Sequence, residues 1–407
     1  MTSVVIGERW RKPHTPVVAA AIVSFVGDGL LVTALPLLAR TLTADPRLIT
    51  GVFVAQLSST PLSPVIAAGV DRYGRPRRVM VAMDLARAVV LVMLLVAVGF
   101  GGVLWLIYPA AALLGAGEIA FSAASWSLVR EVCTEDDLTV ANGQLMVSQS
   151  FGQYFGGPLA GGLLFTISRT LPLIGDAISF VVSSIILRRA PDVRTPTTER
   201  PLREVIREGW KAITTTPAIR VSTVWIAAVA FAQALQLSTL VLISDRVGLG
   251  ARGFGVLLAI IAAGNLIGGM AASRLAKRFG FFALLSSATL IGGLAHLGAA
   301  AADRSAVLVG AALAVDGIVV VVAMVAVTSF RQRLAPPDLV GSVMSTNRML
   351  VVAGTIPSGL LAGVLVNTYG TRVVLAIAGT AMVLVFMIGF QPLRRAIATT
   401  EVTVAAE

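Results

Sequence analysis

Long hydrophobic runs alternate with short polar or charged turns along the whole chain. Each run approaches or exceeds the roughly 20 residues that an α-helix needs to cross the hydrocarbon core of a bilayer. The alternation predicts twelve membrane-spanning helices, at about 16–39, 49–70, 79–100, 103–129, 138–167, 171–187, 221–244, 253–273, 280–301, 305–329, 340–367 and 371–391. The tenth and eleventh are longer than a bilayer requires, which indicates tilted helices.

A charged island at 69–78, Gly-Val-Asp-Arg-Tyr-Gly-Arg-Pro-Arg-Arg, separates the second and third runs. A weaker basic copy at 273–280 follows about half a chain later, which indicates two related halves. A longer polar segment lies between them and contains an amphipathic stretch at 202–210, of a kind that lies on a membrane surface. We therefore expect a six-helix bundle at 1–187, a linker at 188–220, a second six-helix bundle at 221–393 and a tail at 394–407.

Composition supports a membrane protein. Charged residues make up 13% of the chain and hydrophobic residues 56%, whereas soluble proteins contain about 25% charged residues. The net charge of +11 comes from Lys and Arg in the turns. Most of them fall on one side of the predicted topology, and the positive-inside rule then places both termini in the cytoplasm of a bacterial cell, with the chain in the inner membrane.

Several classes of function find no support in the sequence. Because the basic residues lie between spans, nucleic-acid binding is not expected. Cys133 is the only cysteine, so the chain has no intrachain disulfide. It contains no phosphate-binding glycine loop followed by Lys-Ser or Lys-Thr, and no cluster with metal-ligand spacing. We expect neither an enzyme nor a cofactor or metal.

The charged island resembles the motif between helices two and three of the major facilitator superfamily, with departures at Ala67 and Pro76. The second copy has Lys277 where the motif has an acid. The stretches at 84–87, 138–142, 176–180 and 347–348 look like the enterobactin-exporter and macrolide-efflux branch. The resemblance implies an all-α membrane protein with twelve transmembrane helices in two pseudo-symmetric six-helix bundles, the major facilitator fold, around a central cavity that spans one, four and ten help to line.

Glycines cluster in the fifth predicted span and allow a second helix to approach closely. They are similar to the superfamily's antiporter motif, G-x8-G-x3-G-P-x2-G-G, but depart from it by one residue, because Gly157 intervenes before the proline. We expect helix packing by Gly152, Gly156, Gly157, Pro158, Gly161 and Gly162. This face either only packs and bends the helix, or also seals the path against ion leak.

Charged side chains inside predicted spans cost about 2.5–3.5 kcal/mol each on insertion scales and therefore need a reason. Asp28, Glu118 and Asp316 are candidates for proton coupling; the alternative for each is a hydrogen-bonded structural carboxyl. Asp84 and Arg87 are three residues apart, share a helix face and are expected to form a structural ion pair.

Other polar and apolar residues within spans are candidates for substrate binding, with helix–helix contacts as the alternative. These are Gln56, Met146, Gln149, Gln153, Phe231, Gln233, Gln236, Asn265 and Arg348. In the turns, an acid in an otherwise basic motif indicates a conformational latch. Its expected members are Asp71, Arg72, Gly74, Arg75, Arg130 and Glu131.

Together these features predict a monomeric secondary transporter embedded in the lipid bilayer. It would export a small amphipathic organic compound, such as a drug, antibiotic or siderophore, in exchange for protons, and so contribute to multidrug resistance. A lipid or lysolipid flippase on the same fold is the first alternative. A non-transporting membrane scaffold or receptor is the second.

Overall fold

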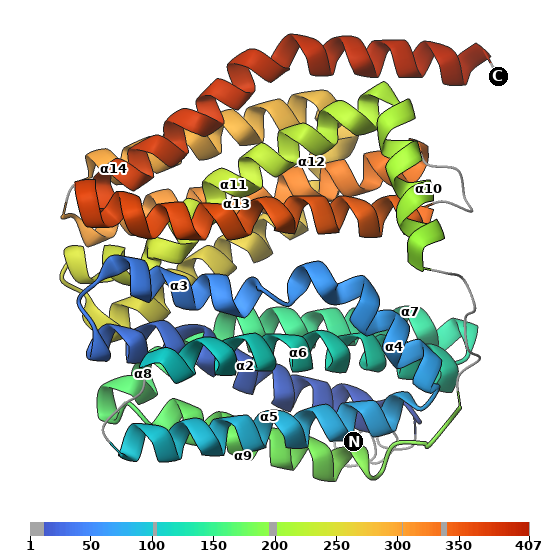
Figure 1. Cartoon of the computed structure of the whole chain (residues 1–407). Coiled ribbons are helices and arrows are strands. Elements are labelled where there is room, and N and C mark those ends of the chain that lie inside the picture. Colours follow the sequence, from blue (N-terminus) through green and yellow to red (C-terminus); the bar gives the residue numbers. More distant parts are fainter. Residues whose placement is uncertain (1–11, 101–103, 195–201, 303, 335–339, 407) are drawn as a thin grey trace, which may run out of the picture. The chain divides into compact units, whose positions relative to one another are not determined.

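The computed structural model describes residues 12–100, 104–194, 202–302, 304–334 and 340–406, and all secondary structure in these ranges is helical (Figure 1). The described residues divide into two compact units. The first comprises those of Met1–Ala44, Ala55–Glu199 and Ala251–Ala259; the second comprises those of Asp45–Val54, Arg200–Gly250 and Ile260–Glu407.

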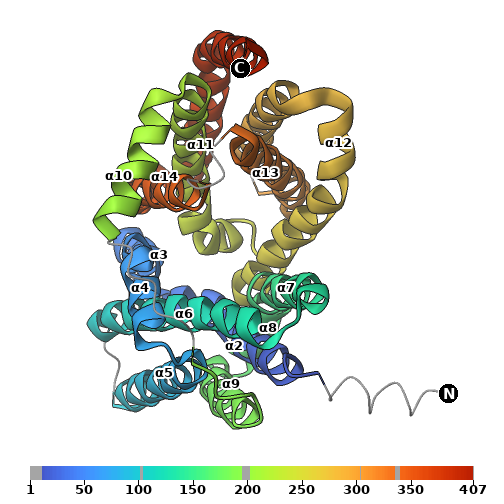
Figure 2. The same ribbon diagram turned by 90° about the vertical axis from the view of Figure 1, so that its right-hand side faces the viewer.

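The first unit is built around α2, against which several other helices pack. Figure 2 views these helices nearly end on. Its elements are α2 (Thr15–Leu42), η1 (Thr60–Leu62), α4 (Ser63–Tyr73), α5 (Pro76–Gly99), α6 (Leu104–Val132), α7 (Glu135–Gln149), the π-helix η2 (Ser150–Gly156), α8 (Gly157–Ile167) and α9 (Leu171–Leu187). Helix α9 packs on α2 and α5, and both η2 and α8 pack on α2.

The second unit has α11 and α14 in extensive contact, with α10 beside both. Its elements are α10 (Leu202–Thr215), α11 (Pro217–Arg246), α13 (Ala306–Leu334), α14 (Val340–Ala406), and the larger part of α12 (Gly250–Ala301). The first turns of α3 (Pro46–Leu57) also belong to this unit. The predicted amphipathic stretch at 202–210 lies in α10.

Two glycines divide the longest helices. Gly280 in α12 has φ 73° and ψ 171°, and Gly370 in α14 has φ 81° and ψ 169°. This backbone region is open essentially only to glycine. With α12 and α14 divided there, and with α3–α4 and α7–α8 each counted as one broken span, the described residues contain the twelve predicted spans in the predicted order.

Proline and glycine set many helix ends. Proline occupies the first or second position of α2, α5, α9 and α11, where the missing backbone N–H is not needed. Gly74 ends α4 with φ 62°, a left-handed conformation that glycine adopts without strain. The charged island is therefore a tight turn between α4 and α5.

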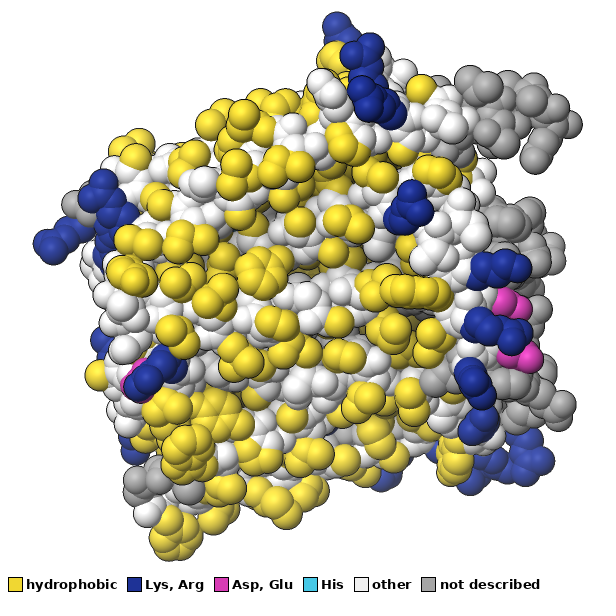
Figure 3. Space-filling model, turned by 45° about the horizontal axis from the view of Figure 1, so that its top comes forward, with side chains coloured by type: hydrophobic (Ala, Val, Ile, Leu, Met, Phe, Trp, Pro, Cys, Tyr) yellow, Lys and Arg dark blue, Asp and Glu magenta, His cyan; other side chains and the backbone are white. Residues whose placement is uncertain are grey.

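Hydrophobic side chains cover the middle of the helices on the face that Figure 3 shows, and most Lys and Arg side chains lie toward helix ends. Among the described residues, nine helical segments are long and apolar enough to cross a membrane by length and composition. Large apolar side chains such as Met93, Trp105 and Ile388 are more than 60% exposed. The molecule is a multi-pass membrane protein, and lipid covers such side chains.

Candidate transport site

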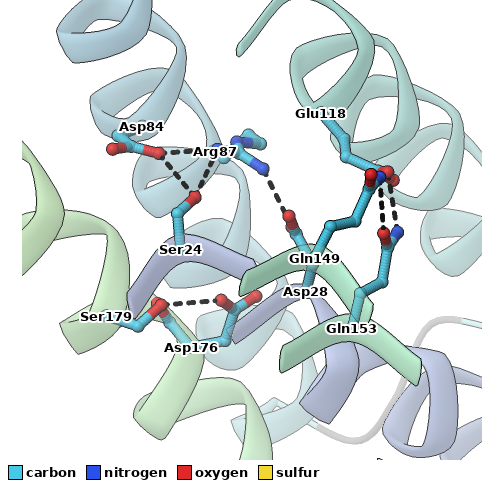
Figure 4. Close-up of polar contacts among 9 residues, drawn as sticks. All are labelled: Ser24, Asp28, Asp84, Arg87, Glu118, Gln149, Gln153, Asp176 and Ser179. Atoms are coloured by element: carbon cyan, nitrogen blue, oxygen red, sulfur yellow. Dashed lines mark hydrogen bonds and ion pairs between the residues drawn. The ribbon is translucent and has the colours of Figure 1, made fainter. Parts of the chain in front are cut away.

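A charge cluster lies at the centre of the first unit and contains one guanidinium, that of Arg87 on α5 (Figure 4). Arg87 Nη1 donates to Asp28 Oδ1 on α2 at 2.8 Å, and Arg87 Nη2 donates to Asp84 Oδ1 at 2.6 Å. Ser24 on α2 accepts from Arg87 at 2.9 Å and donates to Asp84 at 3.1 Å. The ion pair predicted between Asp84 and Arg87 is present, and the same guanidinium also pairs with Asp28 on α2.

Aromatic rings and a glycine enclose the Arg87 side chain, which is 1% exposed. The guanidinium carbon lies 4.1 Å from the centroid of the Phe180 ring and 5.1 Å from that of Phe121, so cation–π attraction adds to the ion pairs. Gly117 on α6 makes room, because a Cβ there would lie 2.8 Å from Arg87 Cδ. Arg87 is thus held by groups from four helices.

A third acid, Asp176 on α9, is fully buried near this cluster. Its Oδ1 accepts a hydrogen bond from Ser179 Oγ at 3.1 Å, and it lies within electrostatic reach of Arg87 and Asp28. Gly27 on α2 packs directly against Asp176 and Ser179, where any larger residue would collide. The cluster therefore contains three carboxyl groups for one guanidinium.

Glu118 on α6 connects to the glycine-rich span through two amides. Gln153 in η2 donates from Nε2 to Glu118 Oε1 at 2.7 Å, and Gln149 donates to Gln153 Oε1 at 3.1 Å (Figure 4). A protonated carboxyl can donate as well as accept, so these hydrogen bonds are compatible with Glu118 in either protonation state. The structure brings these three candidates together, although they come from two different spans.

The glycines of η2 and α8 bring that span into close backbone contact with α2. A Cβ on Gly157 would lie 2.6 Å from Gly29 Cα and 2.7 Å from Val26 O, and a Cβ on Gly152 would lie 2.7 Å from Val26 N. A Cβ on Gly161 would likewise lie 2.8 Å from Leu30 O. Asp28 therefore lies on α2 within a stretch that the glycine-rich span contacts.

In the second unit the structure joins two other candidates. Gln233 on α11 donates from Nε2 to Asp316 Oδ1 on α13 at 2.8 Å, and His296 on α12 lies beside Asp316. Gln236 and Asn265 each have a buried side-chain oxygen that finds no hydrogen-bond partner within the described ranges. The carbonyl of Phe231 accepts a hydrogen bond from Ser358 at 2.6 Å.

Three candidates do not join either cluster. Gln56 is half-buried and its backbone carbonyl contacts α6 at Gly115, where a Cβ would lie 2.6 Å away. Met146 is 61% exposed, and Arg348 on α14 is exposed. For these residues substrate binding stays a prediction.

The expected latch stays a prediction. Within the described ranges, no hydrogen bond or ion pair joins Asp71 to Arg130 or Glu131, and Arg72 is exposed. The turn instead contacts the segment after α9. Asp192 lies 3.7 Å from Arg75 and 3.1 Å from Arg78, and Arg77 donates to Ala190 O at 2.8 Å.

A model of the Major Facilitator Superfamily matches residues 17–356, well over half of the chain. This chain therefore belongs to the Major Facilitator Superfamily, a family of membrane transporters. No curated protein gives a significant match to the sequence.

Solved structures with low sequence identity share the fold. The chain is 15% identical to a bacterial homologue of the human lysosomal transporter Spinster, with a TM-score of 0.71 and coverage of 95% of this chain and 97% of that one. A bacterial homologue of the iron transporter ferroportin has 14% identity, a TM-score of 0.74 and coverage of 94% and 98%. The nucleoside transporter NupG has 13% identity, a TM-score of 0.77 and coverage of 93% and 98%.

Proposed function

We propose that this transporter exports a small amphipathic organic compound in exchange for protons, as a monomer in a bacterial inner membrane with both termini in the cytoplasm. The enterobactin-exporter and macrolide-efflux branch remains the family branch that the motifs favour. Solved structures of this fold include transporters of several kinds, so the proposal depends on the residues of the site.

The excess of acid over base in the charge cluster carries the proposal. Asp28, Asp84 and Asp176 surround Arg87, and within the described residues no other Lys or Arg pairs with them. If all four groups were ionised, the cluster would carry a net charge of −2 in a buried site within the membrane, which is costly. Bound protons remove that cost, and water entering the site would allow their release.

Glu118 offers a second position for the coupling proton. It lies on α6 within electrostatic reach of Arg87, and its hydrogen bond from Gln153 links it to the glycine-rich span that packs on α2. In the cycle we propose, Asp28 or Glu118 binds a proton from outside and releases it inside as substrate is captured. Each proton moving inward gains about 2.3 kcal/mol per 100 mV of membrane potential.

The test is transport by purified protein in proteoliposomes with an imposed pH gradient. A thermal-stabilisation screen of small amphipathic cations, antibiotics and siderophores, repeated at two pH values, first identifies a substrate. We expect Asp28→Asn and Glu118→Gln each to lower gradient-driven uptake at least tenfold. The control is Asp45→Asn, at a partly exposed carboxyl between spans that pairs with Arg47.

Exchange of substrate across the membrane without a pH gradient separates coupling from binding. A coupling residue loses gradient-driven transport and retains exchange, whereas a residue needed for substrate binding loses both. If Asp28→Asn and Glu118→Gln both leave gradient-driven transport unchanged, proton coupling at these carboxyls is wrong.

A further inference from the structure

The second unit contains a polar cluster that is separate from the one around Arg87. Asp316 on α13 is 3% exposed and His296 on α12 is 2% exposed. His296 Nδ1 lies 3.5 Å from Asp316 Oδ1, which also accepts the hydrogen bond from Gln233. Burying an ionisable imidazole and a carboxyl within membrane-spanning helices is costly, so their contact indicates a functional site.

The contacts of the ring identify which nitrogen carries hydrogen when His296 is neutral. Nδ1 lies 2.8 Å from the backbone oxygen of Gly292, one helical turn earlier. A carbonyl oxygen only accepts, so Nδ1 is the donor. In the neutral ring Nε2 is then the acceptor, and this atom is buried with no hydrogen-bond partner in the part of the chain that the structure describes.

A second orphaned atom belongs to α11. Among the described residues, Gln236 Oε1 is also buried and without a hydrogen-bond partner. Gln236, His296 and Asp316 line one hollow, which is too narrow to admit a water molecule. A proton on His296 Nε2 would create a donor in a hollow that is also lined by the residue with this unused acceptor.

The charges around the ring favour the same proton. The remaining side chains of the hollow are apolar, among them Leu313 and Leu375. Of the described residues, Asp316 is the titratable side chain in contact with the ring, and α11 contributes only the uncharged amides of Gln233 and Gln236. With one added proton the pair is neutral overall; without it, the site holds one buried negative charge.

We propose that His296 and Asp316 form a second proton-binding site, in which His296 Nε2 takes up the proton and Gln236 accepts its hydrogen bond. The imidazolium is then held between a carboxylate on α13 and an amide on α11. The site lies in a different unit from Arg87, so the transporter would bind protons in both. Its role in transport depends on the proposed function, but proton binding itself does not.

Nuclear magnetic resonance of protein labelled with ¹⁵N-histidine tests the proposal without any substrate. The chain has two histidines, so His14→Asn leaves a spectrum that contains His296 alone. We expect imidazolium shifts at pH 6 in this protein. In His14→Asn combined with Asp316→Asn, we expect the neutral ring with hydrogen on Nδ1 at the same pH.

Gln236→Leu is the second variant and keeps both members of the pair. It should increase the fraction of neutral ring at pH 6, because the protonated Nε2 loses its acceptor. A His296 ring that stays neutral from pH 5 to pH 9 in folded protein would overturn the proposal, as would an imidazolium signal unaffected by Asp316→Asn. Unchanged gradient-driven transport in Asp28→Asn and Glu118→Gln would overturn the proposed function without altering the expected His296 spectra, so the two proposals fail separately.

Discussion

Replacing Arg87 by methionine tests whether the buried charges of the first unit depend on one another. Methionine keeps the apolar stem but removes the guanidinium, which makes contacts of 2.6 Å to Asp84, 2.8 Å to Asp28 and 2.9 Å to Ser24. The two carboxyls then remain buried without their cation. Removing one partner of a buried ion pair costs about 3–5 kcal/mol, which is roughly a 100- to 4,000-fold change in the unfolding equilibrium.

Arg331 on α13 provides a matched control. It is also 2% exposed, but its contact is with Thr223 Oγ1 at 3.3 Å, and among the described residues no acid pairs with it. Its Nε has no hydrogen-bond partner among those residues either. Burying a charge that has no counter-charge is costly, so Arg331→Met removes that cost and should not lower the free energy of unfolding.

The assay is equilibrium unfolding of purified protein in mixed detergent micelles, followed by tryptophan fluorescence. A triple variant, with Arg87→Met, Asp28→Asn and Asp84→Asn together, should recover much of the lost stability, because the two carboxyls that pair directly with Arg87 are then neutral and Asp176 alone keeps its carboxyl. Equal destabilisation by Arg87→Met and Arg331→Met would refute the pairing argument. So would a triple variant as unstable as the sum of its single changes.

Two further predictions concern helix contact and pH. A Cβ on Gly157 would meet the backbone of α2, so Gly157→Ala should lower the free energy of unfolding by about 1–3 kcal/mol. Gly143 on α7 has nothing within 4 Å of such a Cβ, and Gly143→Ala should stabilise by roughly 0.5–1 kcal/mol; the same micelle assay measures both, and equal effects would contradict the close approach. Burial lowers the pKa of His14, just before α2, from 6.5, and burial raises the pKa of the Cys133 thiol 3.4 Å away. The unfolded chain therefore binds a proton at His14 more readily than the folded one, so stability should fall as the pH drops below about 6.5; His14→Asn should flatten this decline, and an unchanged pH profile would contradict it. Maleimide labelling of Cys133, the only thiol, should be slow at pH 7.5 and faster in His14→Ala, where the thiol is less buried.

The spans could be predicted because the bilayer imposes a length that one sequence displays directly. The spans predicted to begin at 280 and 371 begin where Gly280 and Gly370 interrupt α12 and α14. The Asp84–Arg87 pair followed from helical periodicity, since residues three apart share a face. Each of these predictions uses information local to a few tens of residues.

The contact between Asp28 and Arg87 could not be predicted in the same way. The two residues are 59 positions apart, and their meeting depends on the rotation of α2 and α5 about their own axes. Both helices carry apolar residues on all their faces, so the periodicity of the sequence does not fix that rotation. The glycines of α2 were the available signal, because Gly27 faces α9 and Gly29 faces η2 and α8.

The pairing of Asp192 with Arg75 and Arg78 was missed for a related reason. Charge pattern places the basic turn on one side of the membrane, but it does not say which acid of that side the turn contacts. Likewise His296 and Asp316 lie on consecutive spans, and only the structure gives the relative height of the two side chains. Side-chain register between helices is therefore the information that the sequence lacks.

The π-helical turn η2, from Ser150 to Gly156, bears on how this span tolerates changes in length. The glycine motif in this chain carries one residue more than the superfamily spacing that it resembles. An extra residue in an α-helix rotates everything beyond it by about 100°, whereas a widened turn absorbs the residue and leaves Gly161 facing Leu30. Deleting one residue inside η2 should therefore restore an ordinary helix with its contacts intact. The same deletion after Pro158 would swing the glycine face away from α2, so the wide turn is the one place in this span where the chain can shorten without losing its partner.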